Sequence, residues 1–333
     1  MRHTDPARHG SLGRLGSLLP LTILALLLVP ALEARSDATA GARLTLWGYA
    51  RGTTFVEPRG VAFDPSDGAI YVSNTGAHRI EVFSKLGRPL GRFVHRVERP
   101  TGEVVDGRPT ALVFDAAGHL LVVDQLASYV DVLDRRVRPV TRLAIPSGHA
   151  AAVAVGGNGT IYVGTGAEAS GILRFRRDYA PDGAWGEEGS APGYLKDVSA
   201  LAVLGDSAIA ITCERTDLAV QIFGPTGGYR RGFGTHEVGE ENMSLPSALV
   251  ATADGRLWVL DEIRRTLQVF DAGGVLVAVV TGSGTARGGF DHPSALAWDG
   301  RGSLAVADRA IGRVQVFDIQ VSHEGGASAQ AQP

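Results

Sequence analysis

The stretch that decides the fold is PRGVAFDPSDGAIYVSNTGAHRIEVFSKLG, residues 58–87. It alternates three short apolar runs with polar turn residues, and Asp67-Gly68 supplies the positive φ that a tight hairpin requires. This pattern predicts three antiparallel strands, and a weaker apolar run over residues 89–94 predicts a fourth. The unit is therefore expected to be a four-stranded meander.

The same unit recurs six times along the chain. Each copy contains an apolar tetrapeptide that starts with Leu or Ile and ends just before an acidic residue or its substitute. The six tetrapeptides start at Ile70, Leu120, Ile161, Ile209, Leu257 and Leu304. Successive starts lie 50, 41, 48, 48 and 47 residues apart, which is the period of a propeller blade. Because one such sheet buries too little apolar surface alone, the copies are expected to pack face to face in a closed ring.

The last copy lacks a fourth strand of its own. Residues 43–49 (RLTLWGY) precede the first copy and have the character of a fourth strand. The sequence therefore predicts an all-β, six-bladed β-propeller over residues 43–320, with four-stranded antiparallel blades and the N-terminal strand closing the last blade. Residues 321–333 are small and polar and are expected to form a disordered C-terminal tail.

The N-terminus has the layout of a secretory signal peptide. Three arginines in residues 2–14 are followed by 18 uncharged residues, 15–32, and then by small residues around 31–40. Residues 1–38 are therefore expected to be a signal peptide, and the protein to be exported to the periplasm or the extracellular space. The alternative is an uncleaved segment that tethers the protein to a membrane, although Pro20 and Pro30 make this run marginal as a span.

Residues 58–87 and 292–320 resemble NHL repeats, the blades of six-bladed NHL/TolB-like propellers. The resemblance covers residues 43–320, and the third and fourth copies depart from it because Thr165 and Cys213 replace the acidic residue. It implies an interaction scaffold, since NHL propellers most often bind partners. It also brings in six-bladed relatives that are metal-dependent peptide-amidating lyases and sugar lactonases.

Two rings of residues are expected around one mouth of the central channel, one on each side of the proline position that opens each copy. The ring before it holds Glu57, Arg108, His149, Asp197, Leu245 and His292. The ring after it holds Arg59, Thr110, Ala151, Ser199, Ser247 and Ser294. The candidate ligand-binding residues drawn from the two rings are Glu57, Arg59, Arg108, His149, Asp197, Ser247, His292 and Ser294.

Imidazole and carboxylate groups in the first ring raise the question of a metal. His149, Asp197 and His292, with Glu57, are the candidate ligands of a divalent ion. The other interpretation is a solvated polar rim, which the ring geometry favours because blades three and six lie opposite each other and would separate His149 from His292.

Composition excludes several classes of protein. The single Cys213 rules out an intrachain disulfide framework, and a net charge of −3 without a basic block in the body argues against nucleic acid as a partner. No GxSxG, Walker A, GxGxxG or HExxH motif is present. The expected function is a non-catalytic, monomeric scaffold without cofactor that holds a protein, peptide or glycan. The alternative is a metal-dependent lyase or lactonase-like hydrolase in which Arg59 or Arg108 holds an anionic substrate group.

Two further expectations concern single residues. The acidic position after each tetrapeptide, as in Asp124, Asp261 and Asp308, is expected to accept backbone N–H groups and to pair with a nearby arginine such as Arg313. Three tryptophans at strand positions are expected to be core residues, whereas Trp185 lies in a long loop that grips a ligand or folds over a blade edge. The three core candidates are Trp47, Trp258 and Trp298.

Overall fold

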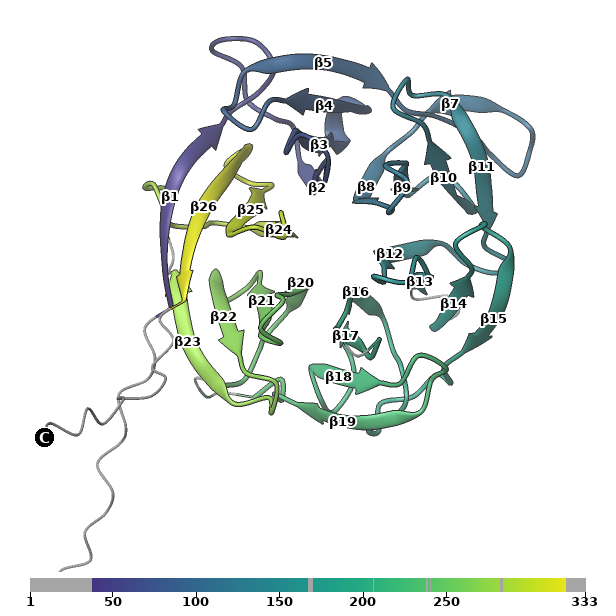
Figure 1. Ribbon diagram of the computed structural model, residues 1–333, viewed down its shortest axis with the longest axis vertical. Coiled ribbons are helices and arrows are strands. Elements are labelled where there is room, and N and C mark those ends of the chain that lie inside the picture. The colour runs from purple at the N-terminus through teal and green to yellow at the C-terminus, as the bar shows by residue number, and fades with distance from the viewer. Residues whose placement is uncertain are drawn as a thin grey trace, which may run out of the picture. The chain divides into compact units, whose positions relative to one another are not determined.

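Six four-stranded antiparallel sheets surround a central channel in the computed structural model (Figure 1). The structure describes residues 38–166, 170–205, 207–237, 239, 241–281 and 284–321. The chain divides into two units, Met1–Arg35 and Ser36–Pro333, and every described residue belongs to the second. The expected signal peptide and C-terminal tail lie outside the described residues, apart from their boundary residues Ala38 and Val321. In the described part of the chain, no helix has the length and hydropathy needed to cross a membrane.

The strands of the first three blades occur in chain order, with one short hairpin between blades one and two. Blade one consists of β2 (Pro58–Phe63), β3 (Ile70–Asn74), β4 (Arg79–Phe83) and β5 (Pro89–Val94). Blade two consists of β8 (Pro109–Phe114), β9 (Leu120–Asp124), β10 (Tyr129–Leu133) and β11 (Pro139–Ala144). Blade three consists of β12 (Ala150–Val155), β13 (Ile161–Thr165), β14 (Gly171–Phe175) and β15 (Pro181–Trp185). Blade one thus reproduces the meander predicted for residues 58–94.

The last three blades repeat the same plan. Blade four consists of β16 (Val198–Val203), β17 (Ile209–Cys213), β18 (Val220–Phe223) and β19 (Tyr229–Phe233). Blade five consists of β20 (Pro246–Ala251), β21 (Leu257–Asp261), β22 (Thr266–Phe270) and β23 (Leu276–Thr281). Blade six consists of β24 (Pro293–Trp298), β25 (Ser303–Asp308), β26 (Arg313–Val321) and β1 (Ala38–Leu46). The predicted six-bladed ring of four-stranded blades is confirmed.

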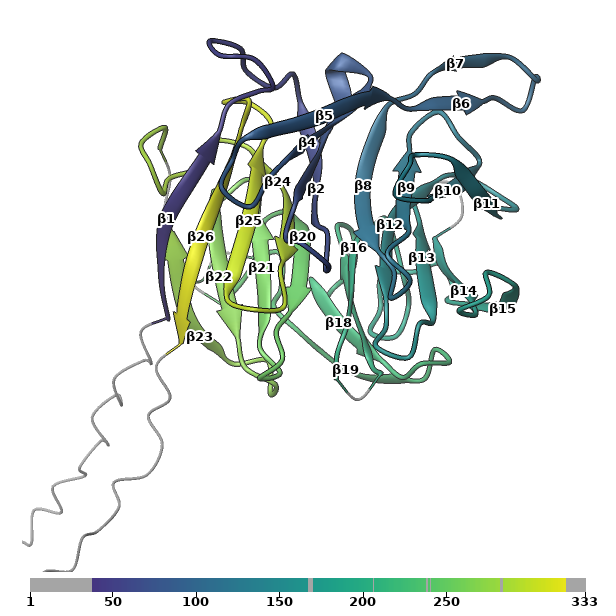
Figure 2. The same ribbon diagram turned by 45° about the horizontal axis from the view of Figure 1, so that its top comes forward.

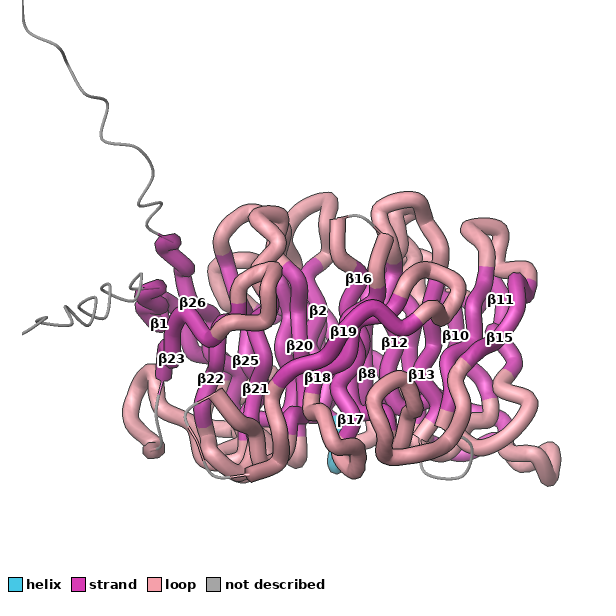
Figure 3. The backbone as a smooth tube through the Cα atoms, turned by 90° about the horizontal axis from the view of Figure 1, so that it is seen from below, coloured by secondary structure: helices cyan, strands magenta, loops and turns pink. Residues whose placement is uncertain are grey.

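The meander gives the ring two different ends, which Figure 3 shows as two rims of loops separated by the strands. One rim, the connection end, carries the links between blades and the turns between second and third strands, including the short helix η1 (Thr75–Ala77). The opposite rim, the turn end, carries the tight turns between first and second and between third and fourth strands. Glycines at the tips of the predicted hairpins, such as Gly68 and Gly118, have positive φ as expected.

Strand β1 closes the ring by pairing with β26, as predicted. The ladder runs antiparallel from Ala38 opposite Val321 to Leu46 opposite Val314, with a register shift between Ala42 and Leu44. The strand begins and ends earlier than the predicted 43–49, so Trp47 lies outside it and is 45% exposed. The expectation that Trp47 belongs to the core is therefore wrong, because the chain leaves the sheet at Leu46.

Six of the seven hydrophobic clusters in the described residues each lie between two neighbouring blades. The cluster between blades six and one includes Leu46 of β1 together with Phe83 and Val316. Trp258 is fully buried between blades five and six, as expected for a core residue, whereas Trp298 is only half-buried. Since each blade contributes to two clusters, removing any blade exposes apolar surface on both of its neighbours.

The acidic residues after the second strands hold the connections between blades. Asp308 accepts hydrogen bonds from the backbone N–H groups of Asp291 (2.8 Å) and His292 (3.1 Å). Asp261 does the same for Ser244 and Leu245. The predicted backbone role is thus confirmed, but Arg313 donates to the carbonyl oxygens of the connecting loop (2.7–3.0 Å) instead of pairing with Asp308.

The connection between blades one and two carries a feature that the sequence did not reveal, a hairpin formed by β6 (Arg96–Glu98) and β7 (Val104–Asp106) that extends from the ring (Figure 2). Its base is held by His95, which is 4% exposed. The His95 ring bridges two carboxylates, with Nδ1 2.9 Å from Asp124 and Nε2 3.0 Å from Asp131. Burial alone would lower the pKa of His95, but the hydrogen bonds to both aspartates outweigh it and raise the pKa to about 9.

Two other residues singled out in the sequence have structural roles. Cys213 is fully buried at the end of β17, and burial raises the pKa of its thiol to about 11, so it is not an activated nucleophile. Trp185 ends β15 and packs against Phe223 of the next blade, with ring centroids 5.1 Å apart. The segment therefore folds over a blade edge.

Candidate functional site

The first strand of every blade faces the central channel, and its alternating side chains line the channel in three successive layers. The polar layer, nearest the connection end, is made of Arg59, Thr110, Ala151, Ser199, Ser247 and Ser294. The aliphatic layer follows and is made of Val61, Leu112, Val153, Leu201, Leu249 and Leu296. The apolar layer, nearest the turn end, is made of Phe63, Phe114, Val155, Val203, Ala251 and Trp298.

The polar layer is the second ring predicted from the sequence, and it surrounds a cavity of about 140 Å³. Arg59, from β2, is the single charged residue that lines this cavity. Within the described residues Arg59 forms no ion pair, and its buried Nε atom has no hydrogen-bond partner. An unpaired guanidinium at the polar end of a channel is a site for an anionic group.

The three serine hydroxyl groups of the polar layer donate their protons to carbonyl oxygens of the neighbouring blade. Ser199 donates to the carbonyl oxygen of Pro246 (2.6 Å), and Ser294 donates to that of Pro58 (2.7 Å). Ser247 makes the equivalent, longer bond to the carbonyl oxygen of Pro293 at 3.3 Å. Toward the channel these hydroxyl oxygens can therefore act only as acceptors.

The other predicted ring lies at the rim of the connection end, where its charged members are paired. Arg108 lies 3.2 Å from Glu57 and also donates to Gln125. Asp197, which has a φ of 50°, forms an ion pair with Arg215. Glu57, Arg108 and Asp197 are therefore each paired with a group of opposite charge, whereas Arg59 has no such partner among the described residues.

The two histidines of the rim also have local contacts. His149 Nδ1 lies 3.3 Å from the carbonyl oxygen of Ala127, and His292 Nδ1 lies 3.5 Å from a carboxylate oxygen of Asp291. Across the described residues, no three His, Cys, Asp or Glu side chains gather closely enough to hold a metal ion. The structure therefore does not bring His149, Asp197 and His292 together into one cluster.

The apolar layer surrounds a second cavity of about 380 Å³ at the turn end, which was not predicted. Its aromatic members, Phe63, Phe114 and Trp298, each end the first strand of a blade. The first-strand sequences PRGVAF, PTALVF and PSALAW could have predicted this apolar layer. Every second residue of a strand lies on the same face, so the last residue of each sequence shares a face with the channel-lining first-strand residues that precede it. The channel is thus polar at one end and apolar at the other.

Comparison with known proteins supports this architecture. Residues 55–83 match the NHL repeat family, and no curated protein matches the chain. Among solved structures, a protein provisionally named a gluconolactonase aligns with a TM-score of 0.61 and 15% identity, over 86% of this chain and 93% of that chain. A Bacteroides thetaiotaomicron protein of unknown function aligns with a TM-score of 0.60 and 15% identity, over 86% and 73%. Virginiamycin B lyase from Staphylococcus aureus aligns with a TM-score of 0.58 and 13% identity, over 85% and 99%.

At these identities the solved structures share the fold and carry no assignment of activity to this chain. The repeat match falls on blade one, the same segment whose pattern recurs in the other blades. Together with the closed ring of six four-stranded sheets, the match describes the chain as a six-bladed β-propeller whose first blade is similar to an NHL repeat.

Proposed function

We propose that this protein is an exported, non-catalytic binding module that holds one end of a protein, peptide or glycan in the cavity at the connection end of the channel. The observation that carries the proposal is Arg59, a cation that faces the cavity without a partner while the neighbouring Arg108 is paired with Glu57. A cavity of about 140 Å³ admits a single side chain or sugar unit, so most of the ligand would lie on the rim outside.

The polar layer defines the chemistry of the ligand group. Arg59 supplies N–H donors for a carboxylate, and the oxygens of Ser199, Ser247 and Ser294 accept hydrogen bonds. A group with one carboxylate and several O–H or N–H donors satisfies both. An acidic sugar unit has this combination, whereas an ionised Asp or Glu side chain supplies the carboxylate without the donors.

Binding is tested with D-glucuronate as probe and glucose as its neutral match, by calorimetry on the folded chain. Glucuronate is expected to bind more tightly than glucose, and Arg59→Gln is expected to weaken it by at least about tenfold, because a charge-assisted hydrogen bond contributes about 1.5–3 kcal/mol. Arg51→Gln, an exposed arginine outside the cavity, is the control and should change nothing. Equal binding of glucuronate and glucose, or retention of glucuronate by Arg59→Gln, would contradict the proposal.

The alternative function, a metal-dependent lyase or lactonase-like hydrolase, requires a bound metal ion. Among the described residues, the His, Asp and Glu side chains of the rim do not form a cluster of three that could bind one. Protein purified without chelator is expected to contain a divalent metal well below one ion per chain. The double variant His149→Ala, His292→Ala should leave this content unchanged in elemental analysis. A stoichiometric metal that the double variant loses would instead favour the lyase or lactonase class.

A further inference from the structure

At the turn end, the turns between third and fourth strands are basic in blades one to three and contain no base in blades four and five. The basic tips, defined as the turns between third and fourth strands in blades one to three, are residues 84–88, 134–138 and 176–180. Their exposed bases are Lys85, Arg88, Arg135, Arg136, Arg138, Arg176 and Arg177. With Asp134 and Asp178 as the acids in these turns, the seven bases leave a net charge of 7 − 2 = +5. The matching turns of blades four and five, 224–228 and 271–275, contain no base.

Most of this positive charge is not neutralised by neighbours. Arg138 pairs with Asp134 at 2.7 Å and Arg176 with Asp178 at 3.4 Å, and the other five bases form no ion pair within the described chain. On the adjacent turns between first and second strands, the carboxylates of Asp64 and Asp115 are buried and accept turn N–H groups, while Asp67 is exposed. The surface that solvent meets is therefore basic across three consecutive blades.

Glycines in those adjacent turns let the bases lie flat over the turn end. A Cβ atom at Gly118 would come within 2.9 Å of Arg135 Nη2, and one at Gly159 within 2.8 Å of Arg177 Cγ. The same position in blade one is Lys85, over Gly68. In each of blades one to three, the repeat thus places one base against the glycine of the adjacent turn, which spreads the charge over three consecutive blades.

Apolar residues stand at two of the basic tips. Leu86, between Lys85 and Arg88, is 79% exposed, and Val137, between Arg136 and Arg138, is exposed with a φ of 62°. Exposed apolar side chains flanked by bases fit the interfacial region of a bilayer, where the apolar group enters the headgroup layer and the bases meet anionic lipid.

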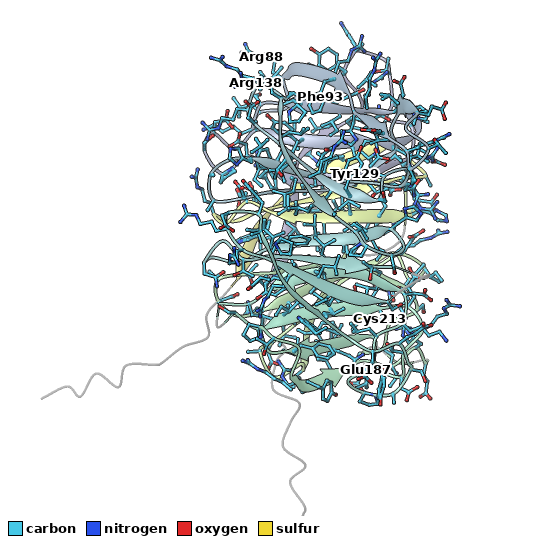
Figure 4. The ribbon with its side chains drawn as sticks, turned by 90° about the vertical axis from the view of Figure 1, so that its right-hand side faces the viewer. Arg88, Phe93, Tyr129, Arg138, Glu187 and Cys213 are labelled. Carbon is cyan, nitrogen blue, oxygen red and sulfur yellow. The ribbon has the colours of Figure 1, made fainter. Side chains whose placement is uncertain are left out.

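The same end of the ring is where the described chain starts and stops. Ala38 and Val321 are paired at the turn end, and the uncharged run 15–32 is joined to the chain just before Ala38. Figure 4 shows Arg88 and Arg138 at one end of the ring and Cys213 toward the other.

We propose that the basic tips form a docking face for membranes with anionic headgroups, which turns the connection end and its cavity away from the bilayer. The proposal does not depend on the ligand of the cavity. A lipid surface is favoured over a polyanionic chain such as nucleic acid because exposed apolar side chains accompany the spread charge. Binding of a polyanionic chain would require the positive charge but not the exposed apolar side chains.

The test uses the chain from Ser36, which retains all of the ring-forming unit and lacks the apolar run. Binding to vesicles of phosphatidylglycerol and phosphatidylcholine is expected, with weakening by salt and no binding to phosphatidylcholine alone. The variant Arg135→Gln, Arg136→Gln, Arg138→Gln should bind on the order of 100-fold more weakly, and Leu86→Ser about tenfold. Arg51→Gln, Arg96→Gln, Arg99→Gln removes the same charge from the connection end and should bind like the unaltered chain.

Three outcomes would overturn the proposal. These are absence of binding to phosphatidylglycerol vesicles, an equal loss in the control variant, and capture of heparin or nucleic acid in place of vesicles. Unchanged thermal unfolding in all variants shows that the comparison concerns binding and not folding, since every substituted side chain is exposed.

Discussion

Replacing His95 with alanine is expected to lower the free energy of unfolding by about 3–5 kcal/mol. The substitution leaves Asp124 and Asp131 buried without the imidazolium that bridges them at 2.9 and 3.0 Å. Removing one partner from a buried ionic network costs this much because the remaining charge loses its compensation. Urea unfolding followed by circular dichroism measures the change, and His292→Ala, at the solvent-exposed rim, is a control expected to cost less than about 1 kcal/mol.

The same network makes stability depend on pH in a defined window. The pKa of His95 is raised to about 9 in the folded chain, whereas an unfolded histidine has a pKa of about 6.5. The stabilisation from the bound proton is therefore complete below about pH 6.5 and is lost as the pH rises through about 9, a loss of up to about 3 kcal/mol. The variant His95→Gln lacks this dependence, so the difference in unfolding free energy between the two proteins should shrink over that window. Parallel curves for the two proteins would show that His95 is neutral in the folded state.

A chain that begins at Trp47 is expected not to fold cooperatively. It lacks β1, whose ladder with β26 extends from Ala38 to Leu46. It also loses Leu46, which is 4% exposed, and the hydrogen bonds of Arg43 to Asp318 (2.6 Å) and Ser303 (3.1 Å). The expected loss is comparable to the whole unfolding free energy of a domain, about 5–15 kcal/mol, because the open ring exposes an unpaired edge and the core between blades six and one.

Thermal unfolding and size-exclusion chromatography compare this chain with one that begins at Ser36. Partial recovery on adding a synthetic peptide of residues 38–46 would show that the missing strand, and not the shorter length, causes the defect. An unfolding midpoint equal to that of the chain from Ser36 would mean that the ring does not require its closing strand.

The number of blades and their strands could be predicted because the deciding signals are local. Each blade repeats an apolar tetrapeptide and a turn, so the starts at Ile70 and Leu257 coincide with the starts of β3 and β21. The wider spacing of 50 residues between the first two copies reflects the hairpin of β6 and β7, but spacing alone does not say what an insertion forms.

The pairing of the candidate site residues could not be predicted, because each partner comes from a distant part of the chain. Arg108 and Glu57 lie 51 residues apart, and Asp197 meets Arg215 from the turn after β17. The register did predict that Arg59, Ser247 and Ser294 share one layer of the channel. It did not predict that Arg59 alone would stay unpaired, since that depends on which charges the other blades bring near it.

Blade six combines the first and last strands of the ring, and this sets an order on biosynthesis. Ala42 pairs with Phe317, which lies 275 positions further along the chain, so the nascent chain has no closed state available until its final blade emerges. Until then the edge of β1 remains open to other chains, and a holding chaperone is most useful during this interval. A message truncated before β26 would yield five blades that can never seal, a product suited to removal by proteases.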